Sequence, residues 1–159
     1  MDIAANIDAL TRVRNKRAYD VDAARLNEGK TEYGLAMIDL NGLKATNDTY
    51  GHEKGDASIK SLCQTVCGVF KHSPVYRVGG DEFIVILEND DFRDREMLIE
   101  QFRDKIREIS GNESLQPWDR ISAAIGCAVY DPGRDRSVED VFNRADEIMY
   151  ENKKKMKAE

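Results

Sequence analysis

The sequence lacks the features that would mark a membrane, secreted or multi-domain protein. No apolar run approaches the roughly 20 residues that a membrane span requires. Polar residues at Asp2, Asn6 and Asp8 interrupt the start of the chain, so no signal peptide is recognisable. With 3 prolines in 159 residues there is no proline-rich linker, and no repeat divides the chain. We therefore expect one domain over residues 1–159, with one sizeable core and no membrane contact.

Cysteine and positive charge are scarce as well. The 3 cysteines are an odd number without a disulfide-rich context, which predicts a reducing compartment and hence a cytoplasmic location. Lysine and arginine number 24 against 30 acidic residues, and the net charge of −6 disfavours general nucleic-acid binding, which depends on a positive surface field. A single nucleotide is not excluded, because a few lysines and a metal ion reverse the potential locally.

The apolar residues that are present recur at helix and strand spacings. Gly79-Gly80, between two short apolar runs, predicts a tight hairpin with positive φ angles. The order of elements favours the α/β (α+β) class, with one mixed sheet and helices packed on its faces. The predicted elements are a helix over 8–28, a strand over 33–40, a helix over 53–71, strands over 74–78 and 82–87, a helix over 92–110, a strand over 120–131 and a last helix that begins near Val138.

Three acidic residues, Asp39, Asp81 and Glu82, stand at the ends of predicted apolar strands. A carboxylate at the edge of a core is costly unless it reaches water, a cation or a metal ion. Each acid alone is compatible with a solvated strand end. If strand 33–40 pairs beside the hairpin, the carboxylates meet at one rim of the sheet, where Mg²⁺ would relieve their repulsion. Adjacent strand residues point to opposite faces, so Asp81 and Glu82 should have different roles.

The polar segment 39–56 is expected to form an irregular loop, with a turn at Gly51 and a helix beginning near Glu53. Gly42 permits a close approach of the backbone, and Lys44 supplies a cation. Exposed N–H groups in such a loop can cradle a phosphate group. The segment is therefore a candidate phosphate site.

Asn47 and Asp56 have two interpretations that the residues alone leave open. They suit turn and helix-cap positions. They also suit recognition of guanine, because a carboxylate matches the N1–H and amino donors that adenine does not present together. The lysines of "NKKKMK" near the C-terminus are similarly open, since a solvated helix end also favours positive charge.

Four stretches of the chain resemble the GGDEF domain family, the diguanylate cyclases. They are "DALTRVRN" at 8–15, "DLNGLKATNDTYGHEKGD" at 39–56, "GGDEF" at 79–83 and "RADEIMYENKKKMK" at 144–157. The resemblance covers nearly the whole chain and keeps the family order. It implies a fold similar to the nucleotidyl cyclase or polymerase palm: a mainly antiparallel central sheet of about five strands, flanked by helices, with a β-hairpin that carries GGDEF.

The resemblance also implies a set of site residues. Asp39 and Asp81 should hold two Mg²⁺ ions per GTP, with Mn²⁺ as an alternative and the Leu40 carbonyl as a further ligand. Glu82 should act in the catalytic centre, as a metal ligand or in deprotonation of the 3′-hydroxyl. The residues implied in substrate binding are Gly42, Leu43, Lys44, Lys153 and Lys157 at the triphosphate, Asn47 and Asp56 at guanine, and Gly79 and Gly80 close to the nucleotide.

The activity that the resemblance implies is the condensation of two GTP into cyclic di-GMP. Two domains face each other as a transient homodimer, and each 3′-hydroxyl attacks the other substrate's α-phosphate with release of pyrophosphate. The alternative is a non-catalytic GTP-binding regulatory module, which the intact Asp39, Asp81 and Glu82 disfavour. An enzyme that makes a mixed cyclic dinucleotide is a further alternative, which Asp56 disfavours. Nothing like a sensor precedes Asp8, which is compatible with a fragment of a larger sensor-regulated protein.

Several positions depart from the family pattern. Arg12 stands where the family has glycine. Lys157 stands where the family often has arginine, and a lysine lacks the forked guanidinium geometry that binds phosphate. Phe70 and Ser73 occupy the places of the arginine and aspartate in the RxxD product-inhibition motif. We therefore expect no feedback inhibition through that motif.

Cys63 and Cys67 are four residues apart on a predicted helix and lack a third cysteine or a histidine nearby in the sequence. Two metal ligands are too few for a structural zinc site. We interpret both as core thiols.

Overall fold

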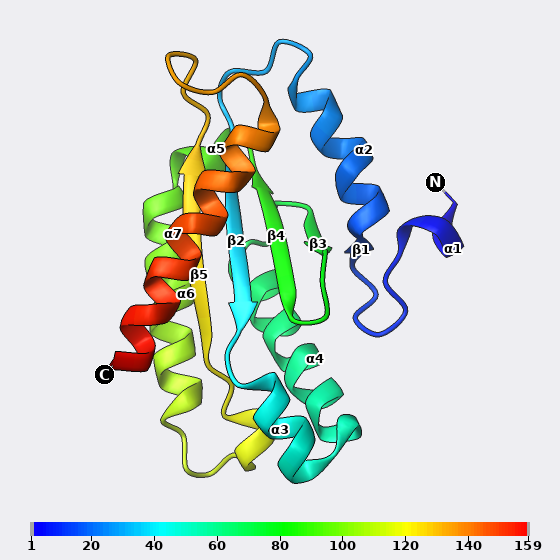
Figure 1. The fold of residues 1–159 in the computed structure, drawn as a ribbon, viewed down its shortest axis with the longest axis vertical. Helices are drawn as coiled ribbons and strands as arrows, with labels where there is room; N and C mark the ends of the chain where they lie inside the picture. The colour runs from blue at the N-terminus through cyan, green and yellow to red at the C-terminus, as the bar shows by residue number, and fades with distance from the viewer. Residues whose placement is uncertain (1, 159) are drawn as a thin grey trace.

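The computed structural model describes residues 2–158, and one five-stranded sheet runs through its centre (Figure 1). The strand order is β1-β3-β4-β2-β5; β1 pairs with β3 in parallel, and the other neighbours are antiparallel. The elements are α1 (Ile3–Asn6), β1 (Arg14–Asn15), α2 (Lys16–Leu26), β2 (Gly34–Leu40), α3 (Leu43–Tyr50), α4 (His52–Val69), β3 (Val75–Arg77), β4 (Glu82–Leu87), α5 (Asn89–Arg93), α6 (Arg95–Ser110), the 3₁₀ turn η1 (Pro117–Asp119), β5 (Ala123–Val129) and α7 (Val138–Ala158).

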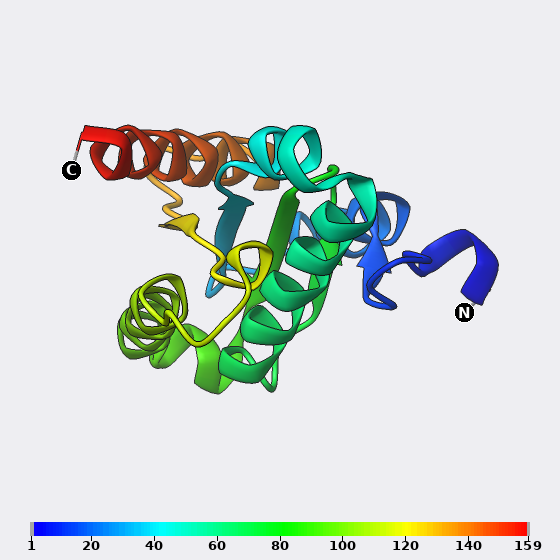
Figure 2. The same ribbon diagram turned by 90° about the horizontal axis from the view of Figure 1, so that it is seen from below.

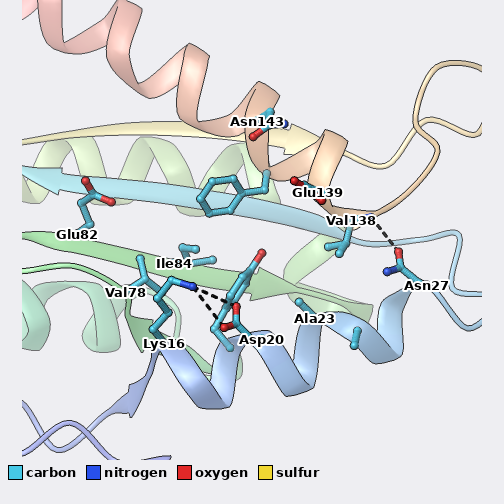
Figure 3. A pocket seen from close by; sticks show the side chains of 13 residues that line it. Lys16, Asp20, Ala23, Asn27, Val78, Glu82, Ile84, Val138, Glu139 and Asn143 are labelled. Atoms are coloured by element: carbon cyan, nitrogen blue, oxygen red, sulfur yellow. Dashed lines mark hydrogen bonds and ion pairs between the residues drawn. The ribbon is translucent and has the colours of Figure 1, made fainter.

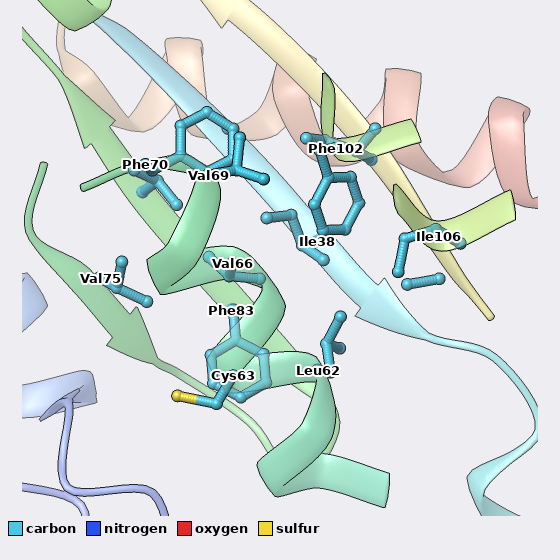
Figure 4. Close-up of a cluster of buried hydrophobic side chains, with 14 of the residues drawn as sticks. Ile38, Leu62, Cys63, Val66, Val69, Phe70, Val75, Phe83, Phe102 and Ile106 are labelled. Atoms are coloured by element: carbon cyan, nitrogen blue, oxygen red, sulfur yellow. The ribbon is translucent and has the colours of Figure 1, made fainter. Parts of the chain in front are cut away.

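The predicted class, a mixed and mainly antiparallel sheet flanked by helices, is confirmed. Alternation along β4 divides the core into two clusters. Phe83 and Val85 face α4 and α6, in a cluster that includes Leu62 and Phe102 (Figure 4). Ile84 points to the opposite face, where α2 and α7 pack. Figure 2 shows α7 on one side of the sheet and α4 and α6 on the other. Within residues 2–158, no helix has the length and apolar character needed to cross a bilayer.

Helix α7 approaches the sheet closely at Gly126 on β5. A Cβ atom at this position would lie 2.2 Å from the backbone nitrogen of Met149 and 2.5 Å from the carbonyl oxygen of Ala145. Both contacts are to backbone, which a rotamer change cannot relieve. Gly126 therefore allows α7 to lie directly on β5.

The predicted helix over 8–28 is wrong in its first part. Residues 8–13 form a turn in which the Asp8 carboxylate accepts hydrogen bonds from Thr11, from the backbone N–H at 2.9 Å and from the hydroxyl at 2.7 Å. Helix α2 begins only at Lys16, where Asn15 Oδ1 accepts from the N–H of Ala18. Short polar side chains that bond to nearby backbone compete with helix formation, and this competition ends the helical pattern early.

The segment after β2 is a helix and not the irregular loop that the sequence predicts. Gly42 adopts a left-handed φ of 72°, and α3 runs from Leu43 to Tyr50 before a second positive φ at Gly51. Two turns with no fully buried residue carry no apolar stripe, so the hydrophobic pattern could not show this helix.

Two smaller expectations also fail. The GGDEF hairpin has no positive φ at Gly79 or Gly80, because the connection is longer than a two-residue turn and Val78 N–H donates to the Glu82 carbonyl at 3.0 Å. The predicted helix over 92–110 begins earlier and divides at Asp94 into α5 and α6.

Candidate active site

Two carboxylates oppose each other where β2 ends and β4 begins. Asp39 on β2 pairs directly with Glu82 on β4 in the antiparallel ladder. Both side chains lie on the α7 face of the sheet, because Met37 and Ile84 belong to the core cluster on that face. Cβ atoms of directly opposed residues lie about 5 Å apart, so the two acids share one environment. Strand β2 thus pairs beside the hairpin, which is the condition under which the sequence brings these carboxylates to one rim of the sheet.

Asp81 joins this pair from the hairpin connection. Its backbone carbonyl accepts a hydrogen bond of 2.9 Å from the N–H of Leu40, which ties the GGDEF turn to the end of β2. The negative charge of Asp81 also acts on both Asp39 and Glu82. The structure therefore places the three acids that the sequence singles out at the same end of β2 and β4.

Lys153 on α7 supplies the positive charge at this site. Its Nζ lies 2.7 Å from Oδ2 of Asp39 and 3.5 Å from the carbonyl oxygen of Leu40. Asp39 is only 8% exposed, and burial raises the pKa of its carboxyl group. The hydrogen bond from Lys153 opposes that shift, and the charge of Asp81 adds to it. Burial likewise raises the pKa of Glu82, and the charges of Asp39 and Asp81 raise it further.

The donors at this site suit a hard divalent cation. Oδ1 of Asp39 is buried and has no hydrogen-bond partner, so it is an acceptor without a donor. Carboxylate oxygens and the Leu40 carbonyl are the ligand types that Mg²⁺ prefers. Between residues 2 and 158 no three acidic, histidine or cysteine side chains are gathered closely enough to form a ready metal cluster. In this structure the positive charge beside Asp39 is the Lys153 ammonium group, which donates to Oδ2. The oxygen atoms at the site are nevertheless of the chemical type that binds Mg²⁺.

Two residues near the site were missed by sequence reasoning. The charge of Asp146 on α7 also raises the pKa of Glu82. Arg77 donates to Asp8 at 3.1 Å and to the carbonyl oxygen of Gly80 at 2.8 Å, and so connects the turn at 8–13 to the GGDEF connection. The position of Arg77 two residues before the glycines was the only signal that could have pointed to it.

The start of α3 lies directly after the end of β2. Left-handed Gly42 precedes Leu43, and the first N–H groups of α3 have no side-chain cap. Such free N–H groups and the helix dipole favour an anion. The Lys44 side chain is 93% exposed and forms an ion pair of 3.8 Å with Asp48 on its own helix.

Asn47 and Asp56 come from the two helices of the α3–α4 pair. A Cβ atom at Gly55 would lie 1.7 Å from Oδ1 of Asn47, so this glycine makes room for the Asn47 side chain. Oδ1 of Asn47 is buried and has no donor. Asp56, the next residue along α4, is exposed. The structure thus places Asn47 against the turn of α4 that carries Asp56.

The remaining predicted residues lie around this centre. Gly79 packs beside Glu82, whose side-chain carbons would lie 3.5 Å from a Cβ atom placed there. Lys157 is exposed, one turn beyond Lys153 on α7. At the positions of the absent RxxD motif, Phe70 is buried in the core and the Ser73 hydroxyl donates to Asp91.

A cavity of about 470 Å³ lies between α2 and α7 and over β4, on the same face of the sheet (Figure 3). Glu82 stands at one end of it, and Ile84 lines its floor. Lys16 and Asp20 form an ion pair of 3.3 Å on its α2 side. The cavity shows that the Glu82 side chain opens to space and is not enclosed by the core.

One protein-family model matches residues 5–159, with the description "Diguanylate cyclase, GGDEF domain". Among curated proteins, the chain is 31% identical over 152 residues to "Diguanylate cyclase VdcA" of Vibrio cholerae, and this match covers 94% of the chain and 44% of VdcA. The chain therefore spans less than half the length of that relative.

Solved structures of this kind have the same fold. The GGDEF domain of DgcB from Caulobacter crescentus in complex with c-di-GMP is 30% identical, with a TM-score of 0.76 and coverage of 94% of this chain and 91% of that one. The diguanylate cyclase SiaD from Pseudomonas aeruginosa, in complex with its activator SiaC, is 25% identical, with a TM-score of 0.79 and coverage of 94% and 58%.

Proposed function

The chain belongs to the diguanylate cyclase GGDEF domain family, and we propose that it condenses two GTP into cyclic di-GMP with release of pyrophosphate. The observation that carries this proposal is the meeting of Asp39, Asp81 and Glu82 beside Lys153. Neighbouring carboxylates repel one another, and a regulatory module that only binds GTP does not require three of them at one site.

We propose that Asp39, Asp81 and the Leu40 carbonyl would hold divalent cations. Bound Mg²⁺ would polarise the phosphoryl oxygens and lower the pKa of the attacking 3′-hydroxyl. The raised pKa of Glu82 makes its carboxylate a stronger base than an exposed glutamate, which suits it to accept the proton of that hydroxyl. Lys153, which lies beside the same carboxylates, would pair with the triphosphate.

The nucleotide is proposed to lie between these carboxylates and the α3–α4 pair. The free N–H groups of Leu43 and Lys44 at the start of α3 would bind phosphate oxygens. Lys157 would add a second positive charge from the end of α7. Oδ1 of Asn47 and the Asp56 carboxylate are acceptors that match the N–H donors of guanine.

Product identity tests the proposed function directly. We expect incubation of the protein with GTP and Mg²⁺ to yield cyclic di-GMP and two pyrophosphates for every two GTP consumed, identified by mass spectrometry. GTP binding without any product would support the regulatory module instead. A cyclic product that contains adenine, formed when ATP is also present, would support the mixed dinucleotide.

Turnover per chain is expected to rise with protein concentration in the micromolar range. Each domain holds one GTP, and neither 3′-hydroxyl reaches an α-phosphate of its own substrate, so two domains must meet. Initial rates measured over a dilution series would reveal this dependence. A flat series, combined with a monomeric sedimentation profile, would contradict the requirement for a transient homodimer.

Asp56→Ala is expected to reduce the preference for GTP over ATP. A site built to hydrogen-bond a substrate discriminates strongly, and removal of the carboxylate leaves the guanine donors unpaired. We measure discrimination as the inhibition constant of ATP divided by the KM for GTP. We expect this ratio to fall by about 10-fold or more. Asp104→Ala, which removes an exposed carboxylate from α6 outside the proposed site, is the matched control and should leave the ratio unchanged. Equal ratios in both variants would mean that guanine is read elsewhere.

Regulation and location are also part of the proposal. Because the chain spans less than half of VdcA, we propose that a sensor or regulatory domain controls the pairing of two such domains. SiaD, solved with its activator, offers an example of a controlled relative. The cysteine content supports a reducing, cytoplasmic location.

A further inference from the structure

A basic groove lies on the face of the molecule opposite α7, where residues 7–14 pass over α4 and β3. One cavity of about 600 Å³ is lined by Arg12, Arg14, Lys71 and His72. A neighbouring cavity of about 260 Å³ is lined by Lys60. Neither lining contains an aspartate or glutamate, although the chain has 30 of them. The charged side chains that line the two cavities, among apolar and neutral ones, are thus all basic.

Most of this positive charge is not neutralised. Arg14 lies 3.6 Å from Asp22, so its charge is partly compensated. Within residues 2–158, Arg12, Lys60 and Lys71 form no ion pair within 4.0 Å. Arg12 also has a left-handed φ of 67°, a conformation that costs a non-glycine residue about 1 kcal/mol or more. The chain keeps a cation here in a backbone conformation that favours glycine.

A thiol lies where the two cavities meet. Cys67 and Val13 line both of them, and Cys67 is partly exposed, whereas the sequence predicts a core thiol. Cys63, one turn earlier on α4, lines the smaller cavity and is buried. The neighbouring Cys63 thiol lowers the pKa of Cys67, and the same interaction, together with burial, raises the pKa of Cys63. Burial raises the pKa of the third thiol, Cys127, to about 11. Reactive cysteines are partly exposed thiolates in electropositive surroundings. Cys67 is partly exposed, and the charged side chains that line the two cavities beside it are basic.

We propose that Cys67 is a thiol-modification site for small anionic disulfides, of which oxidised glutathione is the test case. The Cys67 thiolate attacks one sulfur of the disulfide, and a protein–ligand S–S bond forms as the ligand's own S–S bond breaks. The released thiolate takes a proton from water, and the ligand disulfide is the oxidant. Carboxylates on the bound half would pair with Arg12, Lys71 and His72 in a cavity of the size that small-molecule sites have.

The neighbouring Cys63 does not remove such an adduct easily. Residues at i and i+4 on a helix have Cβ atoms about 5–6 Å apart, whereas a disulfide needs about 3.5–4.5 Å. Attack by Cys63 on the mixed disulfide would therefore distort α4. The raised pKa of Cys63 further reduces its thiolate fraction. The mixed disulfide, and not an internal Cys63–Cys67 bond, is the expected product.

The test compares disulfides of opposite charge on the folded protein near pH 7. Oxidised glutathione is anionic, and cystamine is cationic. The rate at which each reagent modifies the protein is divided by the rate at which it modifies an unstructured peptide thiol. We expect glutathione to be favoured by about 10-fold or more, and the preference to shrink in high salt. Intact mass and peptide mapping should show one adduct, on Cys67. Cys67→Ser should abolish it and Cys127→Ser should not.

Arg12→Gly separates charge from folding, because glycine suits the left-handed φ of this position. We expect this variant to remain folded and to lose at least about half of the glutathione preference. Lys154→Ala, which removes an exposed lysine from α7 on the opposite face, is the matched control and should keep it. Adducts mainly on Cys63 or Cys127, an internal disulfide, or equal normalised rates for the two reagents would each overturn the proposal.

Discussion

Asp81→Asn is expected to abolish turnover with Mg²⁺ while the fold remains intact. The substitution removes a negative charge that acts on both Asp39 and Glu82, and with it a proposed metal ligand. Metal ions in such sites contribute several kcal/mol of charge stabilisation, and each 1.36 kcal/mol corresponds to a factor of ten in rate, so we expect a fall of about 10³-fold or more. The contact of Asp81 with Leu40 uses a backbone carbonyl, which asparagine retains.

Steady-state assays of pyrophosphate release would measure this loss, with circular dichroism and thermal unfolding to establish that the variant is folded. Asp104→Asn provides the same change in charge on the exposed surface of α6, outside the proposed site, and should retain activity. Product formation by Asp81→Asn at the rate of the unaltered protein would contradict the metal role. A fall shared equally by both variants would point to net charge and not to the site.

Gly126→Ala is expected to lower stability by about 3 kcal/mol, at the upper end of the range for overpacking. The added Cβ would meet the backbone of Met149 at 2.2 Å and of Ala145 at 2.5 Å, so α7 must move away from β5. For a domain of this size, the melting temperature should fall by about 6–12 °C. Because α7 carries Lys153, the displacement should also reduce activity at temperatures where the variant is folded.

Gly68→Ala is the matched control for this prediction. Gly68 lies within α4 and has no atom within 4 Å of an added Cβ. Alanine is favoured over glycine in helices by up to about 1 kcal/mol, so this variant should be as stable as the unaltered protein or slightly more stable. Thermal unfolding of both variants would measure the difference. Equal melting temperatures would mean that α7 tolerates the extra methyl group at Gly126.

The central strands and long helices were predictable because their signals are local. Every residue of β2 is buried, which produces the continuous apolar run seen in the sequence. The apolar spacing over 53–71 corresponds to α4, and the GGDEF motif is five adjacent letters. The errors at 8–13 and 42–51 arise where short polar contacts and glycine conformations decide the backbone, which hydrophobic periodicity does not record.

The amino-acid sequence by itself determined the family, the fold class and the candidate acids Asp39, Asp81 and Glu82. Each of these follows from short motifs or apolar patterns of residues that are close together along the chain. Only the tertiary structure decided which groups meet. Lys153 reaches Asp39 across 114 positions, and Arg77 reaches Asp8 across 69. Such pairs depend on the register of β2 with β4 and on the close packing of α7 against Gly126. Contacts of this kind follow from the packing of the whole core, which no local pattern specifies.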